Sequence, residues 1–279
     1  MANYTTQDIK ELREATGAGM MDVKKALDEA NGDREEALKI IRIKGQKSLS
    51  KREGRATGAG LIAAGVIDTP AGQRGTLVEV KSETDFVAKN DKFIEVADKV
   101  LKAALDSGAD TVEGVLAAKV DGETAKDVLE GLAAVIGERL ELASVAQLEG
   151  DKVALYLHRT SKDLPPQVGV LVATDAAGAE IGRDIAMHIT ANTPAYTSRE
   201  DIPADDLARE RTTLEEATRA EGKPEAAVAK IVEGKLNGFF KDNVLLDQPY
   251  ARDTKLSVSQ VLEQAKAKVT GFARIRVGE

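Results

Sequence analysis

Two segments of this sequence repeat the same order of elements: two β-type apolar runs followed by an amphipathic helix. The runs are residues 61–67, 75–80 and 91–105 in the first unit, and 153–158, 168–174 and about 183–191 in the second. In the helix at 91–105, apolar residues recur at the spacing of one helix face. A hairpin followed by a helix, present twice, predicts two related α/β units that arose by a degenerate internal duplication.

Composition narrows the class of protein that these units can form. The chain has 279 residues, 42% hydrophobic and 31% charged, which is typical of a globular protein of about two domains. The net charge of −8 argues against direct nucleic-acid binding, because neutralising phosphates needs a positive surface. Cysteine is absent, so disulfides, thiolate metal sites and a cysteine nucleophile are excluded. No apolar run approaches the ~20 residues of a membrane span, and the N-terminus is unlike a signal peptide, so we expect a cytoplasmic protein that binds no membrane.

The first 45 residues predict a small module of three short helices. Thr16–Gly19 and Asn31–Gly32 are turn-type segments that separate apolar residues at helical spacing, and Asp33 can cap the third helix. A module of this size usually binds a partner. The basic residues between positions 39 and 55 are expected to form a solvated linker or helix surface.

The C-terminal half contains an insertion with a different pattern. Residues 204–221 and 224–240 each carry apolar residues at helical spacing, and Gly222-Lys-Pro224 joins them. Glycine just past one helix and proline at the first turn of the next are typical of a short connection between antiparallel helices. The insertion is therefore predicted to project as a helical hairpin. The alternating apolar residues at 269–277 predict a closing strand.

These patterns divide the chain into three parts and predict an α+β fold. Helices are also expected at residues 111–118 and 125–139. The parts are residues 1–54, the three-helix module with its basic linker; residues 55–144, the first α/β subdomain; and residues 145–279, the second subdomain, with the hairpin inserted at about 204–240. Each subdomain is expected to contain a small antiparallel sheet.

No motif provides a convincing catalytic or cofactor site. Gly58–Ala63 has the glycine spacing of a dinucleotide-binding loop, but β-prone residues follow where a helix should start, so a strand is favoured. Gly45–Ser48 lacks the earlier glycine and the residue order of a phosphate-binding loop. His158 and His188 have no second ligand at metal spacing and are expected to be structural, although a histidine at a strand end can also contact a partner. We expect no cofactor and no metal, and binding is a better class than catalysis.

A four-residue step, Thr84-Asp85-Phe86-Val87, lies between the strand at 75–80 and the helix at 91–105. A carboxylate beside a large aromatic side chain on a short turn can present a charge and an apolar group to one point on a partner. Alternatively, Phe86 can extend the buried stripe that contains Phe93, as a hydrophobic staple does. Spacing alone favours the buried alternative.

Four segments, in order along the chain, resemble the elongation factor Ts family. They are Leu12-Arg-Glu-Ala-Thr-Gly-Ala-Gly-Met-Met-Asp22 with Lys24–Leu27 and Asn31–Asp33, then Glu83-Thr-Asp-Phe-Val-Ala-Lys-Asn90, Ile185-Ala-Met-His-Ile189 and Val269-Thr-Gly-Phe272. Because the four matches are ordered and cover essentially the whole chain, the resemblance is specific. It favours a partner-contacting Phe86 over a buried one.

This resemblance implies a guanine nucleotide exchange factor for elongation factor Tu, which is not an enzyme because it changes no covalent bond. The N-terminal helices would form a ubiquitin-associated-like module that docks on the GTPase domain through Arg13, Met20 and Met21, with Lys24 nearby. The hairpin would be the family's projecting coiled-coil element, used to form a homodimer or to contact a partner. Contacts of the terminal helical module that many members carry after the closing strand are not transferred to this sequence.

The resemblance also implies how nucleotide is released. Phe86 would wedge between elements of the GTPase domain beside the Mg²⁺ ion that GDP requires, and Asp85 would engage the displaced segment. His158 would contact the same region. Thr84 and Val87 of the same segment are also expected to contact elongation factor Tu.

Two other classes of protein remain open from the sequence. A dinucleotide-dependent enzyme requires a helix to begin at Gly58–Ala63. An adaptor would use the three-helix module and the hairpin to bind a partner without altering its nucleotide.

Overall fold

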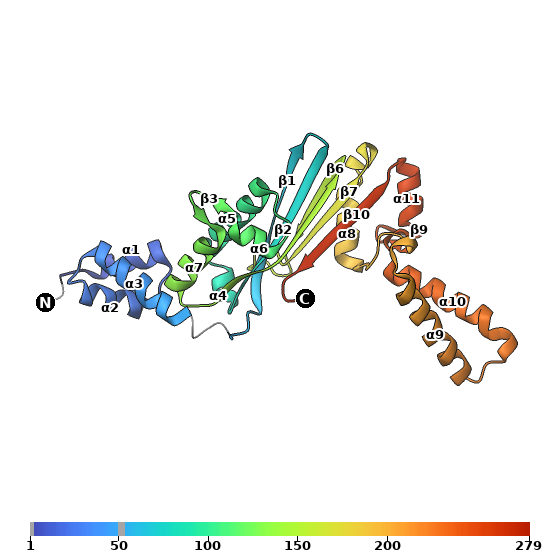
Figure 1. Ribbon diagram of the computed structural model, residues 1–279, viewed down its shortest axis with the longest axis horizontal. Coiled ribbons are helices and arrows are strands. Elements are labelled where there is room, and N and C mark those ends of the chain that lie inside the picture. The colour runs from blue at the N-terminus through green and yellow to red at the C-terminus, as the bar shows by residue number, and fades with distance from the viewer. Residues whose placement is uncertain (1–2, 50–53) are drawn as a thin grey trace.

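The computed structural model describes residues 3–49 and 54–279, which form an elongated molecule (Figure 1). The N-terminal helices lie at one end, two sheets with helices on their outer faces lie in the middle, and a helical hairpin projects at the other end. The predicted α+β class with small antiparallel sheets is confirmed. In the part of the chain that the structure describes, no helix is long and apolar enough to cross a membrane.

The N-terminal module contains the three expected helices, α1 (Thr6–Thr16), α2 (Met20–Glu29) and α3 (Arg34–Leu49). Thr5 and Asp8 form a reciprocal capping box at the start of α1, and Gly17, with φ 77°, ends it in the left-handed conformation. Asp33 accepts a hydrogen bond from the amide of Glu36 at 2.9 Å, as expected for a cap. The small core consists of buried apolar residues from all three helices, including Leu12, Val23, Leu27, Ala37 and Ile41.

The first sheet has the order β1-β2-β5 and is antiparallel throughout. Its strands are β1 (Ala59–Thr69), β2 (Gly72–Ser82) and β5 (Leu140–Gly150). Because Gly58–Ala63 leads into β1 and no helix begins there, the dinucleotide-binding alternative is wrong. β5 was not predicted, and it runs across the expected subdomain boundary between residues 144 and 145.

Helices cover one face of this first sheet. They are α4 (Asp85–Ala88), α5 (Asp91–Ser107), α6 (Val112–Ala117) and α7 (Ala125–Ile136), with the short strands β3 (Lys119–Val120) and β4 (Glu123–Thr124) before α7. Phe93 and Val100 of α5 pack against Val78 and Val80 of β2 in the largest apolar cluster. Gly137, with φ 77°, ends α7, so this helix stops three residues before the predicted Arg139.

The second sheet has the order β10-β7-β6 and repeats the arrangement of the first. Its strands are β6 (Lys152–His158), β7 (Val168–Thr174) and β10 (Val269–Arg276), packed against α8 (Gly182–Asn192) and α11 (Val258–Ala265). The remaining short elements are η1 (Ala176–Ala179), η2 (Arg199–Asp201), η3 (Leu245–Asp247), β8 (Pro249–Tyr250) and β9 (Asp253–Ser257). The predicted hairpin, following helix and closing strand are confirmed.

The two sheets stack face to face through their other surfaces. Ile62 and Leu77 of the first sheet form an apolar layer with Val153 and Leu171 of the second. A Cβ built at Gly75 would lie 2.8 Å from side-chain carbons of both Leu171 and Val153, so glycine lets the strands approach closely. The central body is therefore a helix–sheet–sheet–helix stack.

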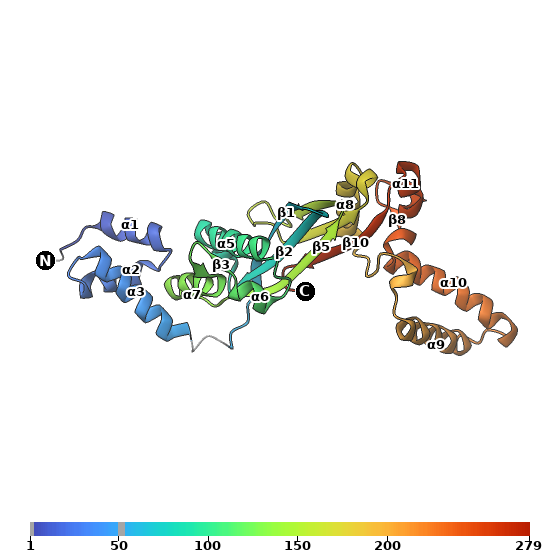
Figure 2. The same ribbon diagram turned by 45° about the horizontal axis from the view of Figure 1, so that its top comes forward.

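The inserted hairpin consists of α9 (Ala204–Ala220) and α10 (Glu225–Asn243), and it points away from the sheets (Figure 2). Val228, Val232 and Leu236 of α10 are buried against Leu207 and Leu214 of α9. Gly222, with φ 74°, makes the turn between them. The two expected helices and their short connection are confirmed.

Candidate partner-binding site

Phe86 is the most exposed large apolar side chain in the described residues. It lies in the short helix α4, directly after β2, and 81% of its surface is accessible. Phe93, the proposed core partner in the staple alternative, is fully buried. The buried alternative for Phe86 is therefore wrong. An aromatic side chain exposed to this extent is typical of a contact surface.

Asp85 and Lys89 form an ion pair beside the Phe86 ring. The Lys89 Nζ donates to Oδ2 of Asp85 at 2.9 Å and lies 5.9 Å from the centre of the Phe86 ring. This hydrogen bond, together with the attraction between the charges, holds the pKa of Asp85 below its ordinary value. α4 therefore presents an aromatic ring with an ionised carboxylate next to it.

Thr84 and Val87 of the same segment anchor the turn instead of facing outward. The Thr84 hydroxyl donates to Oε1 of Glu138 at 2.7 Å, and its amide donates to Oε2 of the same carboxylate at 3.1 Å. Val87 is 7% exposed and belongs to the apolar cluster under β1 and β2. Of the four predicted contact residues, two point outward and two hold them in place.

Glu138 is a residue that the sequence analysis missed. It follows Gly137, the glycine that ends α7, and the glycine was the available signal that a loop begins there. In the same loop, the amide of Arg139 donates to Glu83 at 2.7 Å. Hydrogen bonds therefore connect the loop after α7 directly to the loop that leads into α4.

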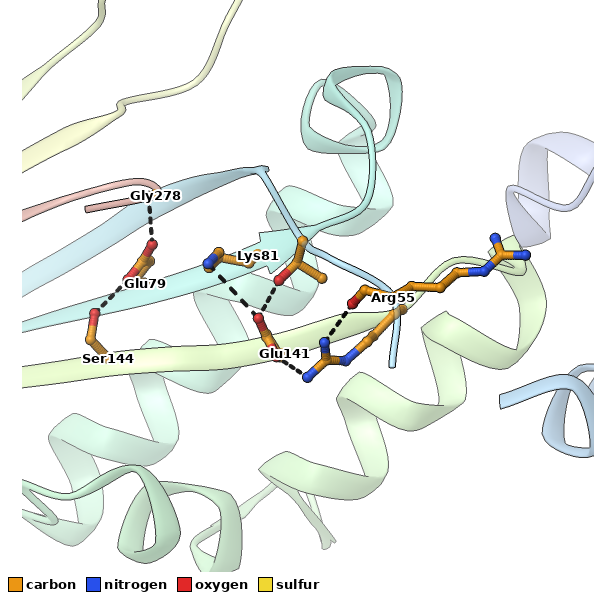
Figure 3. Close-up of polar contacts among 8 residues, drawn as sticks. Arg55, Glu79, Lys81, Glu141, Ser144 and Gly278 are labelled. Carbon is orange, nitrogen blue, oxygen red and sulfur yellow. Dashed lines mark hydrogen bonds and ion pairs between the residues drawn. The ribbon is translucent and has the colours of Figure 1, made fainter. Parts of the chain in front are cut away.

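Further polar contacts fix the segment that precedes β1 (Figure 3). Arg55 pairs with Glu83 at 2.9 Å, and the Arg139 guanidinium donates to the Arg55 carbonyl at 2.6 Å. Glu141 accepts from Arg139 and lies 3.9 Å from Lys81. Lys44 of the same basic stretch pairs with Glu29, and Lys51 and Arg52 lie outside the described residues.

A buried carboxylate in the first sheet holds the C-terminal residues (Figure 3). Glu79 is 4% exposed, accepts from the Ser144 hydroxyl at 2.6 Å and from the amide of Gly278 at 3.1 Å. Burying a carboxylate is costly unless it is hydrogen-bonded, and these two donors satisfy one oxygen each. The chain after β10 is thereby attached to β2.

The N-terminal candidates are all exposed, and one of them lies close to α4. Met20 and Met21 are 58% and 62% exposed at the start of α2, and Arg13 and Lys24 are also exposed. An open cleft of about 590 Å³ separates α1 from the start of α5. Its lining residues are Lys10, Arg13, Glu14, Gly17, Lys89, Asn90, Asp91 and Lys92. The cleft places Arg13 across from Lys89, whereas Met20, Met21 and Lys24 do not line it.

His158 lies at the same end of the sheet stack as α4. It is the last residue of β6, half-buried, with Nδ1 3.2 Å from the Tyr156 hydroxyl. Its carbonyl accepts from the Gln167 amide, and the Gln167 side chain donates to the Gly60 carbonyl at 2.8 Å. Because Gly60 pairs with Lys81 near the end of β2, His158 is located near the strand end that leads into α4.

His188, in contrast, is a structural residue, as expected. It is 1% exposed, and its Nδ1 accepts from the amide of Ala251 at 3.1 Å. The ring proton is therefore on Nε2, which donates to Oε1 of Gln248 at 2.8 Å. Burial lowers the pKa of His188, and the hydrogen bond to Gln248 opposes this only in part.

Comparison with known proteins identifies the family. A family model described as "Elongation factor TS" matches residues 83–279, which is more than half of the chain. Proteins named elongation factor Ts from Beutenbergia cavernae, Arthrobacter sp. (strain FB24) and Saccharopolyspora erythraea are 58%, 57% and 54% identical, each aligned over 100% of both chains. The chain belongs to the elongation factor Ts family. The family match begins at Glu83, so it contains the whole of the Thr84–Val87 segment, and the full-length relatives extend the similarity through the N-terminal module.

Proposed function

We propose that this protein acts in translation elongation as the guanine nucleotide exchange factor for elongation factor Tu. Membership of the elongation factor Ts family supports the process and the partner. The observation that supports the mechanism is the exposure of Phe86, an aromatic side chain presented on a turn that is fixed from below by Thr84 and Val87. A rigid support is what a side chain needs to displace part of a partner.

Phe86 would insert beside the site where elongation factor Tu holds GDP with its own Mg²⁺ ion. Mg²⁺ requires near-ideal octahedral geometry, so a small displacement of its surroundings weakens the binding of both ion and nucleotide. Asp85, kept ionised by Lys89, would engage the displaced segment, and His158 would contact the same region. By linkage, GDP and the exchange factor then weaken each other's binding by the same factor.

The N-terminal module would supply a second contact with the GTPase domain. Arg13, Met20, Met21 and Lys24 are the proposed contact residues, and their exposure is consistent with this role. The hairpin α9–α10 would allow self-association as a homodimer, and no direct contact with nucleic acid or membrane is proposed. The role in elongation implies the cytoplasm as the compartment.

The test is the release of fluorescent GDP from elongation factor Tu, with and without this protein. We expect the wild type to accelerate release and the Asp85→Ala/Phe86→Ala variant to lose most of this acceleration. Phe86→Leu, which keeps part of the apolar volume, should be intermediate. If the wild type binds elongation factor Tu without accelerating release, the proposal is wrong and the protein is an adaptor.

A further inference from the structure

Helices α3 and α7 meet through their backbones at a single glycine. A Cβ built at Gly45 would lie 2.7 Å from Cα of Ala134, and closer still to the carbonyl carbon and oxygen of that residue. Real Cβ atoms essentially never come within 3.0 Å of another heavy atom. Gly45 has an ordinary helical conformation, so glycine is required here by the close approach and not by the backbone dihedrals.

Two further contacts near Gly45 join the N-terminal module to the first subdomain. Val135 of α7 is half-buried and packs into the apolar cluster of the N-terminal helices. A Cβ built at Gly17, just past α1, would lie at ordinary contact distances of 3.5 Å from Ile136 and 3.8 Å from the Asn90 side chain. The module is therefore attached to the last turn of α7 and to the start of α5.

This attachment sets the distance between the two groups of proposed contact residues. Arg13 lies in α1 four residues before Gly17, and it lines the same open cleft as Lys89. Lys89 in turn pairs with Asp85 next to Phe86. A shift of the N-terminal module relative to α7 would therefore change the distance between Arg13 and the α4 turn.

We propose that Gly45 is a positioning residue, whose direct contact with Ala134 holds the N-terminal module at the spacing needed to bind the same partner molecule as Asp85 and Phe86. The proposal rests on the proposed function. Two sites that are held at a fixed spacing bind one partner more tightly than two sites whose spacing varies, because less orientational freedom is lost on binding.

A matched pair of substitutions separates this role from general helix stability. Alanine is a better helix former than glycine, so Gly45→Ala improves local propensity while it forces α3 and α7 apart. Gly131→Ala makes the same chemical change in α7, at a position where nothing lies within 4 Å of the added Cβ. If Gly45→Ala weakens nucleotide exchange and Gly131→Ala does not, the loss is caused by the overlap with Ala134 and not by the change from glycine to alanine in a helix.

The spacing can be measured directly because the chain contains no cysteine. Spin labels at Glu35→Cys in α3 and Lys126→Cys in α7, both exposed positions, report the distance between the module and the core. We expect Gly45→Ala to lengthen or broaden this distance distribution and Gly131→Ala to leave it unchanged. Val135→Ala removes apolar packing between α7 and the N-terminal helices without adding volume, so it serves as a milder second variant and should broaden the distribution.

The exchange assay then tests whether the spacing matters. In Gly45→Ala we expect the concentration for half-maximal GDP release to rise about tenfold with little change in the maximal rate, since Phe86 is untouched. Arg13→Ala should raise that concentration strongly in the wild-type background but less than about twofold in Gly45→Ala. An unchanged distance distribution in Gly45→Ala, or an equal effect of Arg13→Ala in both backgrounds, overturns the proposal. If the wild type fails to release GDP, the proposed function fails, while the distance measurement still reports the contact.

Discussion

Phe86 and Phe93 are seven residues apart in sequence and lie in opposite environments, because Phe86 is 81% exposed and Phe93 is fully buried. The turn between α4 and α5 separates them: Asn90 caps α5 by accepting from the amide of Lys92 at 2.8 Å, and α4 ends before it. One aromatic residue thus stabilises the first subdomain, and the other is available to a partner.

This contrast predicts opposite effects of two alanine substitutions. Phe93→Ala should lower the free energy of unfolding by about 3–5 kcal/mol, the usual cost of emptying a buried aromatic site. Phe86→Ala should leave the free energy of unfolding within about 0.5 kcal/mol of the wild type, as for other surface substitutions. Urea denaturation followed by circular dichroism measures both. Substantial destabilisation by Phe86→Ala would show that the side chain packs against its own chain.

Removal of Glu138 should loosen the turn that carries Phe86. Glu138→Ala leaves the half-buried amide and hydroxyl of Thr84 without their partner, which typically costs about 1–3 kcal/mol. We expect lower stability together with slower nucleotide exchange. Glu130→Ala, at an exposed position of α7, is the control and should change neither quantity. Normal exchange by Glu138→Ala would mean that the fixed turn is unnecessary.

Removal of Mg²⁺ from elongation factor Tu should reduce the part of the acceleration of GDP release that depends on Phe86. If Phe86 acts by disturbing the surroundings of that ion, chelation with EDTA already produces part of the effect. The ratio of GDP release rates between wild type and Phe86→Ala should therefore be smaller in EDTA than in millimolar Mg²⁺. Stopped-flow measurement of fluorescent GDP release gives this ratio. An equal ratio in both conditions would exclude the Mg²⁺ site as the point of action.

Stability should fall as the pH drops below about 6.5 because of His188. Burial lowers the pKa of His188 in the folded chain, so below pH 6.5 the unfolded chain binds a proton that the folded chain does not. The stabilisation is complete above the ordinary pKa of 6.5 and is lost as the pH falls, by at most about 1.4 kcal/mol per pH unit. Thermal denaturation at several pH values should show a lower Tm toward pH 5, and His188→Gln should flatten this dependence. If Tm depends on pH equally in His188→Gln and in the wild type, the dependence arises from other titratable groups.

Much of the fold follows from local patterns in the sequence. The capping residues Thr5 and Asp33, the glycine turn at Gly222 and the apolar spacing of α5 are local signals, and the structure places helix ends at or near each of them. α11 also had such a signal, because Ser257 and Gln260 form a capping box there. That helix was missed although its start could have been identified.

β5 could not be recognised in the same way. Its register shifts where Glu79 pairs with Ser144 and Val80 pairs with Leu142, so Ala143 is an extra residue in the strand. Before this bulge Leu140 and Leu142 face the helices, and after it Val145 does, so the alternation of period two is broken. The pairing is set by the neighbouring strand and not by the sequence of β5.

The candidate site was predictable only in part. The resemblance identified the Thr84–Val87 segment but not which of its side chains face outward, because that depends on Glu138, a residue 54 positions from Thr84. The approach of Gly45 to Ala134 likewise joins two helices far apart in sequence. Long-range contacts of this kind leave no periodic pattern in either segment.

The wedge mechanism requires that this protein and GDP weaken each other's binding to elongation factor Tu. Calorimetric titration of nucleotide-free and GDP-bound elongation factor Tu gives two dissociation constants, whose ratio is the coupling factor. We expect a large ratio for the wild type, of at least about 100-fold or ~2.7 kcal/mol, and a ratio close to one for Phe86→Ala. If Phe86→Ala binds both forms with the wild-type ratio, Phe86 does not weaken GDP binding and the wedge mechanism is wrong.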